Sequence, residues 1–269
     1  MRQAINGFAM AYTDSGKGLP LLLIHGYPLN RHMWEPQVKE LGDLLRAVAP
    51  DLRGHGESES VSGPYSMDLF VDDLAAFLDA LGIQQKIVLC GLSMGGYIAL
   101  AFQRKYAARL QALILTATRA AGDSPQAQAG RDQAAETARE KGVEAIVETL
   151  LPKLLAPETP QNDPELVRRV RSIISSTSLD GVLGDLAALK NRPDSRPFLK
   201  DIQVPTLILH GTEDQIIPSQ EAKEMQAAIP DARLQLLPQA GHMLNLEQPA
   251  LFNAAVRSFI SSLPKGDSG

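Results

Sequence analysis

Short apolar runs recur along most of the chain and predict buried strands. Six such runs cover residues 19–26, 46–51, 86–91, 110–118, 205–211 and 233–238. Continuous apolar strands are typical of a sheet that is covered on both faces. Residues 2–16 contain an Asn-Gly pair between two short strand-like pieces, which predicts an antiparallel hairpin at the sheet edge.

Amphipathic segments separate these runs. Residues 66–82 repeat apolar side chains about every 3.6 positions and end at a glycine, and residues 220–230 and 248–263 predict two further helices. Strands that alternate with helices favour an α/β fold. We therefore expect a mostly parallel central sheet with helices on both faces.

The segment from 119 to 196 interrupts this alternation. It has no strand pattern, is rich in Ala, Glu, Arg and Gln, and carries four prolines between residues 152 and 164. It predicts three or four helical pieces, of which 124–142 is the clearest. We expect a core formed by residues 1–118 and 197–269, with 119–196 inserted as a small helical cap.

Composition narrows the class of protein. Of the 269 residues 44% are hydrophobic and 21% charged, with a net charge of −5, so nothing favours binding to nucleic acid or an anionic membrane. The single cysteine excludes an internal disulfide. No apolar run is long enough to span a membrane, and the N-terminus lacks a signal-peptide pattern. A cytoplasmic location is expected.

Ser93 stands between glycines where a predicted strand meets a predicted helix. The segment Gly91-Leu92-Ser93-Met94-Gly95 matches G-x-S-x-G, which in this context is a nucleophile elbow that exposes the serine hydroxyl. The alternative is an ordinary glycine-rich turn with a helix-capping serine.

A serine nucleophile needs a base, and histidine suits that role near neutral pH. The five histidines are His25, His32, His55, His210 and His242. Only His242 follows both Ser93 and a loop with carboxylates, which is the order serine, acid, histidine of one fold class. That loop follows the strand 205–211 and offers Glu213 or Asp214 as the acid. Because parallel strands end at one edge of a sheet, these groups are expected to meet.

Five segments carry a resemblance to a known family. They are "HGYP" at 25–28, "DLRGHGES" at 51–58, "GLSMGG" at 91–96, "GTEDQIIP" at 211–218 and "GHMLNLEQP" at 241–249. From about residue 3 to 262 the chain resembles the α/β-hydrolase fold superfamily. It looks like the serine-nucleophile members: carboxylesterases, enol-lactonases and carbon–carbon bond hydrolases. The motifs are specific for the fold and triad but not for the substrate.

The resemblance implies roles for individual residues. It implies a catalytic triad of Ser93, Asp214 and His242, and an oxyanion hole built from the backbone N–H groups of Tyr27 and Met94. Such donors stabilise the negative oxygen of a tetrahedral intermediate.

Further implications concern the surrounding residues. In the family His25, Asp51 and Arg53 are structural, and the cap roofs the pocket. Members with aspartate in place of the nucleophilic serine are dehalogenases or epoxide hydrolases, which the serine at 93 argues against. Asp123 is the alternative acid if the acid follows an earlier strand. Neither a metal-ligand spacing nor a dinucleotide fingerprint occurs, so no metal or cofactor is expected.

The expected activity is hydrolysis of an uncharged or weakly polar carboxylic ester of small to medium acyl chain through an acyl-serine. The expected substrate-binding residues are Trp34, Leu92, Arg119, Leu150 and Leu154. The leucines belong to an apolar stripe between 146 and 155 that either faces the pocket or packs the cap on the core. Alternatives are an enol-lactonase or carbon–carbon hydrolase with the same triad, and a non-catalytic small-ligand receptor. The sequence leaves the oligomeric state open.

Overall fold

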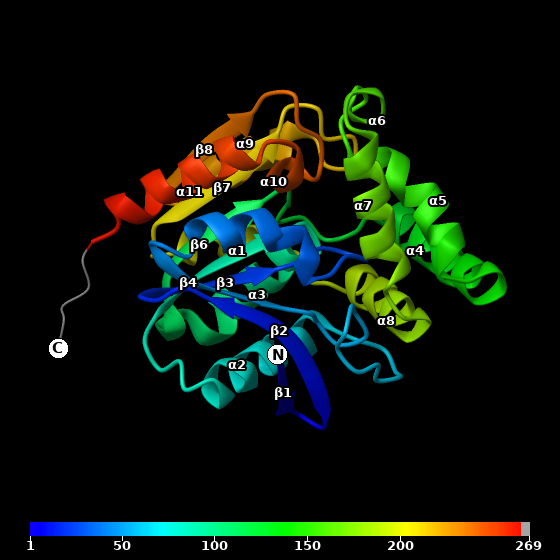
Figure 1. Cartoon of the computed structure of the whole chain (residues 1–269), viewed down its shortest axis with the longest axis horizontal. Coiled ribbons are helices and arrows are strands. Elements are labelled where there is room, and N and C mark those ends of the chain that lie inside the picture. Colours follow the sequence, from blue (N-terminus) through cyan, green and yellow to red (C-terminus); the bar gives the residue numbers. More distant parts are fainter. Residues whose placement is uncertain (265–269) are drawn as a thin grey trace.

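Eight strands form one sheet at the centre of the computed structural model, which describes residues 1–264 (Figure 1). The order across the sheet is β1-β2-β4-β3-β5-β6-β7-β8; β1 and β2 are antiparallel to their neighbours and the other strands are parallel. The strands are β1 (Arg2–Ile5), β2 (Phe8–Ser15), β3 (Leu19–Ile24), β4 (Leu45–Pro50), β5 (Ile87–Leu92), β6 (Leu110–Thr116), β7 (Thr206–Gly211) and β8 (Ala232–Leu237). All six predicted apolar strands and the predicted hairpin are confirmed.

Alternate residues of the buried strands supply two cores, one on each face of the sheet. In β3, Leu22 and Ile24 face one core, whereas Leu21 and Leu23 face the other. The first core is covered by α2 (Met67–Ala80), α3 (Met94–Tyr106) and α9 (Ser219–Ala228). The second is covered by α1 (Glu35–Leu41) and α11 (Pro249–Ser262). The predicted α/β class, with helices on both faces, is confirmed.

The segment between β6 and β7 is helical and lies at one end of the sheet (Figure 1). It contains α4 (Pro125–Lys141), α5 (Val143–Leu154), α6 (Thr159–Asn162), α7 (Pro164–Ser175) and α8 (Leu179–Lys190). Residues 119–196 are all described and include no strand, as expected. Their five α-helices exceed the three or four predicted. The exact division at residues 119 and 196 stays a prediction.

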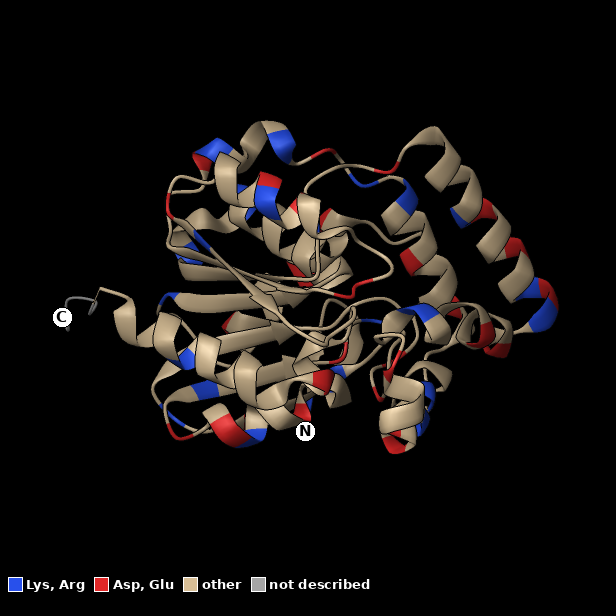
Figure 2. Cartoon of the chain, turned by 90° about the horizontal axis from the view of Figure 1, so that it is seen from above, with Lys and Arg blue, Asp and Glu red and all other residues tan. Residues whose placement is uncertain are grey.

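Short helical turns complete the chain: η1 (Arg31–Trp34), η2 (Ala107–Arg109), η3 (Arg196–Asp201) and α10 (Leu244–Glu247). Positive and negative positions are interspersed over the outer helices rather than separated by sign (Figure 2). Within residues 1–264, no helix combines the length and the apolar character needed to cross a bilayer.

Candidate active site

Ser93 occupies the tight turn between β5 and α3, as the sequence predicts. Its backbone φ angle of 55° lies in a region that residues other than glycine rarely adopt. Among the hydrogen bonds that hold the turn, Ser93 N donates to Thr116 O (2.9 Å) and Thr118 Oγ1 donates to Ser93 O (2.8 Å). A Cβ atom on Gly91 would lie 2.1 Å from the carbonyl oxygen of Gly95, so the close approach of strand and helix requires glycine. Strain that is maintained in this way is common at functional sites.

His242 and Asp214 form a buried pair beside this turn. His242 Nδ1 lies 2.8 Å from Asp214 Oδ2, and both side chains are at most 3% exposed. Asp214 Oδ1 accepts hydrogen bonds from Ile216 N (2.8 Å) and Ile217 N (3.0 Å). Burial alone would raise the pKa of Asp214, but His242 and these backbone donors outweigh it, so the pKa lies below its ordinary value. The carboxylate is therefore ionised and fixed against the imidazole.

Glu213, the other acid that the sequence offers, faces elsewhere. It borders a separate groove together with Glu158 and Asp163. The imidazole of His210 already has a hydrogen-bond partner, because its Nε2 lies 2.9 Å from the carbonyl oxygen of Ile217. Of the two neighbouring acids, Asp214 is the one that contacts His242.

One cavity of about 150 Å³ joins the serine to the histidine. Its lining residues are Tyr27, Ser93, Met94, Tyr97, Arg119, Arg131, Leu150, Leu154, Leu189, Ile216, Ile217 and His242. The structure thus brings together seven of the ten residues expected at the site, and Asp214 reaches it through His242. No hydrogen bond joins Ser93 Oγ to His242 among the described residues. Such contacts commonly tighten only when substrate binds.

The loop after β3 lies directly against the serine. A Cβ atom on Gly26 would be 3.2 Å from Ser93 Cβ, which places Tyr27 beside the turn. Within residues 1–264 neither Tyr27 N nor Met94 N donates to a protein acceptor. Two unpaired backbone donors therefore flank Ser93, and this arrangement suits an anionic oxygen.

Two expected substrate-binding residues do not line this cavity. Trp34 is fully buried in the core on the α11 side of the sheet, and its ring centroid lies 6.0 Å from that of Phe252. Leu92 precedes Ser93 in β5, and it packs into the same core. The prediction of a pocket role for Trp34 and Leu92 is corrected by these positions.

Sequence reasoning missed five lining residues: Tyr97, Arg131, Leu189, Ile216 and Ile217. Ile216 and Ile217 closely follow the candidate acid Asp214 in the sequence, and this closeness was a signal that they line the cavity. Tyr97 lies about one helical turn beyond Ser93, so its spacing from the motif was a second signal. Arg131 and Leu189 belong to the cap, where nothing in the sequence marks which side faces the serine.

The residues expected to be structural make buried contacts. His25 Nε2 accepts a hydrogen bond from Leu52 N (3.0 Å). Asp51 pairs with Arg31, and Arg53 pairs with Asp73 at 2.7 Å. In the described part of the chain, no group of three His, Cys, Asp or Glu side chains is arranged to hold a metal ion.

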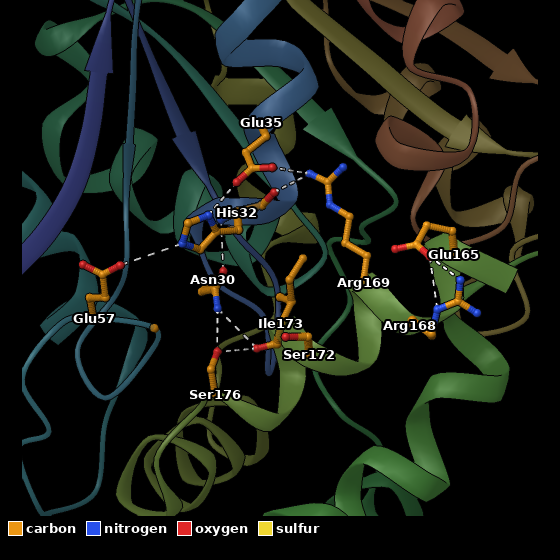
Figure 3. Close-up of a pocket in the computed structure, with 11 residues that line it drawn as sticks. Asn30, His32, Glu35, Glu57, Glu165, Arg168, Arg169, Ser172, Ile173 and Ser176 are labelled. Carbon is orange, nitrogen blue, oxygen red and sulfur yellow. Dashed lines mark hydrogen bonds and ion pairs between the residues drawn. The ribbon is translucent and has the colours of Figure 1, made fainter. Parts of the chain in front are cut away.

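A larger groove, whose lining does not include Ser93, lies between η1 and α7 (Figure 3). It encloses about 680 Å³, and its charged side chains pair with one another, as Arg169 does with Glu35 at 2.9 Å and His32 with Glu35 at 2.7 Å. Because it contains none of the triad candidates, the smaller cavity is the candidate active site.

Comparisons with known proteins agree with this geometry. Residues 20–249 match the family model described as alpha/beta hydrolase fold. The chain is 31% identical over 252 residues to 3-oxoadipate enol-lactonase 2 of Acinetobacter baylyi, covering 93% of this chain and 92% of that protein. It is 31% identical over 264 residues to 2-hydroxymuconate semialdehyde hydrolase of a Pseudomonas species, covering 92% and 89%.

A solved structure is similar over almost the whole chain. It is a thermophilic esterase from Thermogutta terrifontis, solved with malate bound, at 42% identity and a TM-score of 0.94. The match covers 98% of this chain and 97% of that one. These relatives are named as hydrolases, but their named substrates differ.

Proposed function

The chain belongs to the α/β-hydrolase family, and on that premise we propose that it is a serine hydrolase that cleaves carboxylic esters through an acyl-serine intermediate. One observation carries the proposal. A serine held in a strained turn shares a small cavity with a histidine whose other ring nitrogen lies 2.8 Å from a buried carboxylate. This is the arrangement that activates a serine hydroxyl.

In the proposed mechanism His242 Nε2 accepts the proton of the Ser93 hydroxyl while Oγ attacks the carbonyl carbon of the ester. Asp214 remains ionised and stabilises the imidazolium. The tetrahedral intermediate collapses, the bond to the alcohol oxygen breaks, and the alcohol leaves with the proton from His242. Water then attacks the acyl-serine by the same steps, which frees the acid and restores Ser93.

The backbone N–H groups of Tyr27 and Met94 are proposed as the oxyanion hole. Within residues 1–264 neither N–H group has a protein acceptor, which supports this role, as does the position of Met94 at the N-terminus of α3. The positive end of the helix dipole favours negative charge there. Fixed donors of this kind stabilise charge that develops only in the transition state.

The relatives favour cleavage of an ester bond. An enol-lactonase and an esterase, at 31% and 42% identity, both carry names that imply this chemistry, because a lactone is a cyclic ester. A carbon–carbon bond hydrolase would use the same triad, as the name of a third relative suggests. Parallel rates on simple esters, enol-lactones and vinylogous diketones distinguish these substrates, and absence of turnover on all of them would favour a receptor.

Labelling with a sulfonyl fluoride tests the nucleophile. We expect one adduct, mapped to Ser93, with loss of esterase activity in proportion to labelling. Ser93→Ala should lower kcat by about 10⁴-fold or more. Ser172→Ala, at an exposed serine outside the cavity, is the matched control and should keep full activity. An adduct on another residue, or an active Ser93→Ala variant, would contradict the proposal.

A further inference from the structure

Three arginines share one carboxylate at the wall of the catalytic cavity. Asp123 Oδ1 lies 3.0 Å from Arg119 Nη2 and 2.7 Å from Arg192 Nη1, and Asp123 Oδ2 lies 3.0 Å from Arg131 Nε. Three positive charges therefore meet a single negative charge. Burial would raise the pKa of Asp123, but Arg131 and Arg192 lower it below its ordinary value, so Asp123 is ionised. The cluster has an excess of two positive charges.

The arginines differ in burial, and this difference locates the excess charge. The side chains of Arg192 and Asp123 are 2% and 0% exposed. They form a buried ion pair whose opposite charges cancel. Arg192 also donates to the carbonyl oxygens of Leu189 and Ala121. Arg119 and Arg131 are 24% and 28% exposed, and both line the cavity that contains Ser93. The two unneutralised charges therefore face the place where substrate binds.

Arg119 and Arg131 both have guanidinium N–H donors that make no hydrogen bond within the described residues. A guanidinium has five N–H donors, of which Arg131 uses only Nε, toward Asp123, and Arg119 only Nη2. Within the described residues no other hydrogen bond from either side chain is formed. Asp123 thus holds both groups in place and leaves most of their donors free. A planar guanidinium with free donors matches the two oxygens of a carboxylate.

We infer that Arg119 and Arg131 form an anion site for the substrate, so that the preferred substrate is a short ester or lactone that also bears a free carboxylate. This inference rests on the proposed serine hydrolase function. It replaces the uncharged ester expected from the sequence, which places Arg119 but not Arg131 among the substrate-binding residues.

The size and walls of the cavity limit that substrate further. About 150 Å³ lies below the range of about 300–1,000 Å³ that is usual for drug-sized ligands. Leu150, Leu154 and Leu189 form apolar walls beside the arginines. A chain of a few carbons between the scissile carbonyl and the carboxylate fits both features. Long acyl chains do not.

Matched pairs of esters test the inference. Monoethyl esters of malonic, succinic, glutaric and adipic acid are compared with ethyl esters of unbranched monocarboxylic acids of equal chain length. 3-Acetoxypropionic acid is compared with propyl acetate, which places the charge on the alcohol side instead. We expect at least one acid-bearing ester to have a kcat/KM about 10-fold or more above its neutral partner, as charge-assisted hydrogen bonds imply.

The double variant Arg119→Met/Arg131→Met removes the free charges but leaves Asp123 paired with Arg192, so no buried charge is stranded. It should lose the preference for acid-bearing esters, so that the ratio of kcat/KM between each acid-bearing ester and its neutral partner falls to about 1. Arg168→Met, on an exposed arginine of α7, is the control and should keep the preference. A preference that survives the double variant, or wild-type protein without any preference, would overturn the inference.

A binding measurement separates this inference from the proposed function. Calorimetry with succinate and the Ser93→Ala variant should show binding that is lost when both arginines are also replaced. Arginine-dependent binding without turnover of any ester would support the anion site and reject the hydrolase. Turnover of neutral esters, with neither succinate binding nor acid preference, would reject the anion site and support the hydrolase.

Discussion

Asp214 and Glu213 are neighbours in the loop after β7, yet only Asp214 contacts His242. Asp214→Asn keeps the shape of the side chain but removes the charge that stabilises the imidazolium in the proposed mechanism. We expect kcat to fall by about 10³- to 10⁴-fold, as for other triad acids. Glu213→Gln is the matched control and should be close to neutral. Steady-state rates on one ester, measured for both variants, check this expectation.

The opposite pair of results would show that Glu213 is the acid. Equal and small effects would mean that the acid lies elsewhere. The alternative candidate from the sequence, Asp123, is fully engaged by three arginines. Asp123 is therefore poorly placed to act as the acid that orients His242.

At the scale of single residues, the sequence predicts the position of a residue well when that residue belongs to a local motif. Ser93 lies in its own elbow, and His242 and Asp214 each follow a recognisable strand. Trp34 and Leu92 were placed wrongly because closeness in sequence to a motif does not fix the direction of a side chain. Arg131 was missed because α4 is polar along most of its length, so its sequence does not distinguish the exposed face from the face toward Asp123.

At the scale of elements, the end of α5 is joined to the loop that carries His242. Glu247 Oε1 accepts hydrogen bonds from Ala156 N (2.7 Å) and Thr159 Oγ1 (2.6 Å), and Oε2 accepts one from Gly241 N (2.7 Å). A further bond runs from Met243 N to Leu154 O (3.0 Å). The helix that supplies Leu150 and Leu154 to the cavity is thus fixed to the histidine loop.

Glu247→Gln tests this connection. An amide has one oxygen where the carboxylate has two, so either Ala156 N or Gly241 N loses its acceptor. Leaving a buried donor unpaired should lower the free energy of unfolding by about 1–3 kcal/mol. We also expect faster amide exchange at Gly241 and a lower kcat, because His242 is less firmly held.

Burial raises the pKa of Glu247, so these measurements belong at about pH 8, which favours the ionised carboxylate. Glu158→Gln, at an exposed carboxylate that borders the same groove, is the control. It should change neither stability nor exchange. Unaltered exchange at Gly241 in Glu247→Gln would contradict the proposed connection.

Strands and helices whose apolar residues recur at a regular spacing were predictable from the sequence. The helices of the cap were less predictable. The Asn-Gly pair gives the hairpin because Asn6 and Gly7 both adopt positive φ, 41° and 83°. In the cap a proline would be expected to break a helix. Pro152 instead lies inside α5, whereas Pro160 and Pro164 lie in the first turns of α6 and α7, where proline is tolerated.

At the scale of the whole molecule, the cap rests on the core through contacts that no local pattern reveals. His55 Nε2 lies 2.8 Å from Asp185 Oδ2, and both side chains are fully buried. Thr177 Oγ1 donates to the carbonyl oxygen of Pro28 (2.8 Å). These partners are more than 120 positions apart in the sequence. A single sequence shows each residue but not the pairing, which is why the lining of the cavity was harder to predict than the positions of Ser93, Asp214 and His242.

Buried histidines make the stability of the whole molecule depend on pH. Burial, the largest cause, lowers the pKa of His25 well below its ordinary value, and burial also lowers that of His210. In the unfolded chain both regain a pKa near 6.5. As the pH falls below about 6.5, the unfolded state therefore takes up protons that the folded state does not, and folding stability decreases. Burial lowers the pKa of His55, but Asp185 outweighs it and the pKa is raised. His55 therefore acts in the opposite sense, because the folded state binds its proton at a higher pH than the unfolded chain does, and this gain is complete once the pH lies below the unfolded pKa. The loss from His25 and His210 is therefore clearest below about pH 6.5.

Urea unfolding at a series of pH values between about 7.5 and 5.5 measures this dependence. We expect the free energy of unfolding to decline toward acid, by up to about 1.4 kcal/mol per pH unit for each buried neutral histidine. His25→Asn, whose amide can still donate to Gly26 O as His25 Nδ1 does, should show a shallower decline. If that variant does not fold, nitrogen-detected NMR of the wild-type protein should find His25 neutral at about pH 5.5. A His25 that is protonated there, or an equal decline in the variant, would show that burial of this imidazole does not set the acid limit of stability.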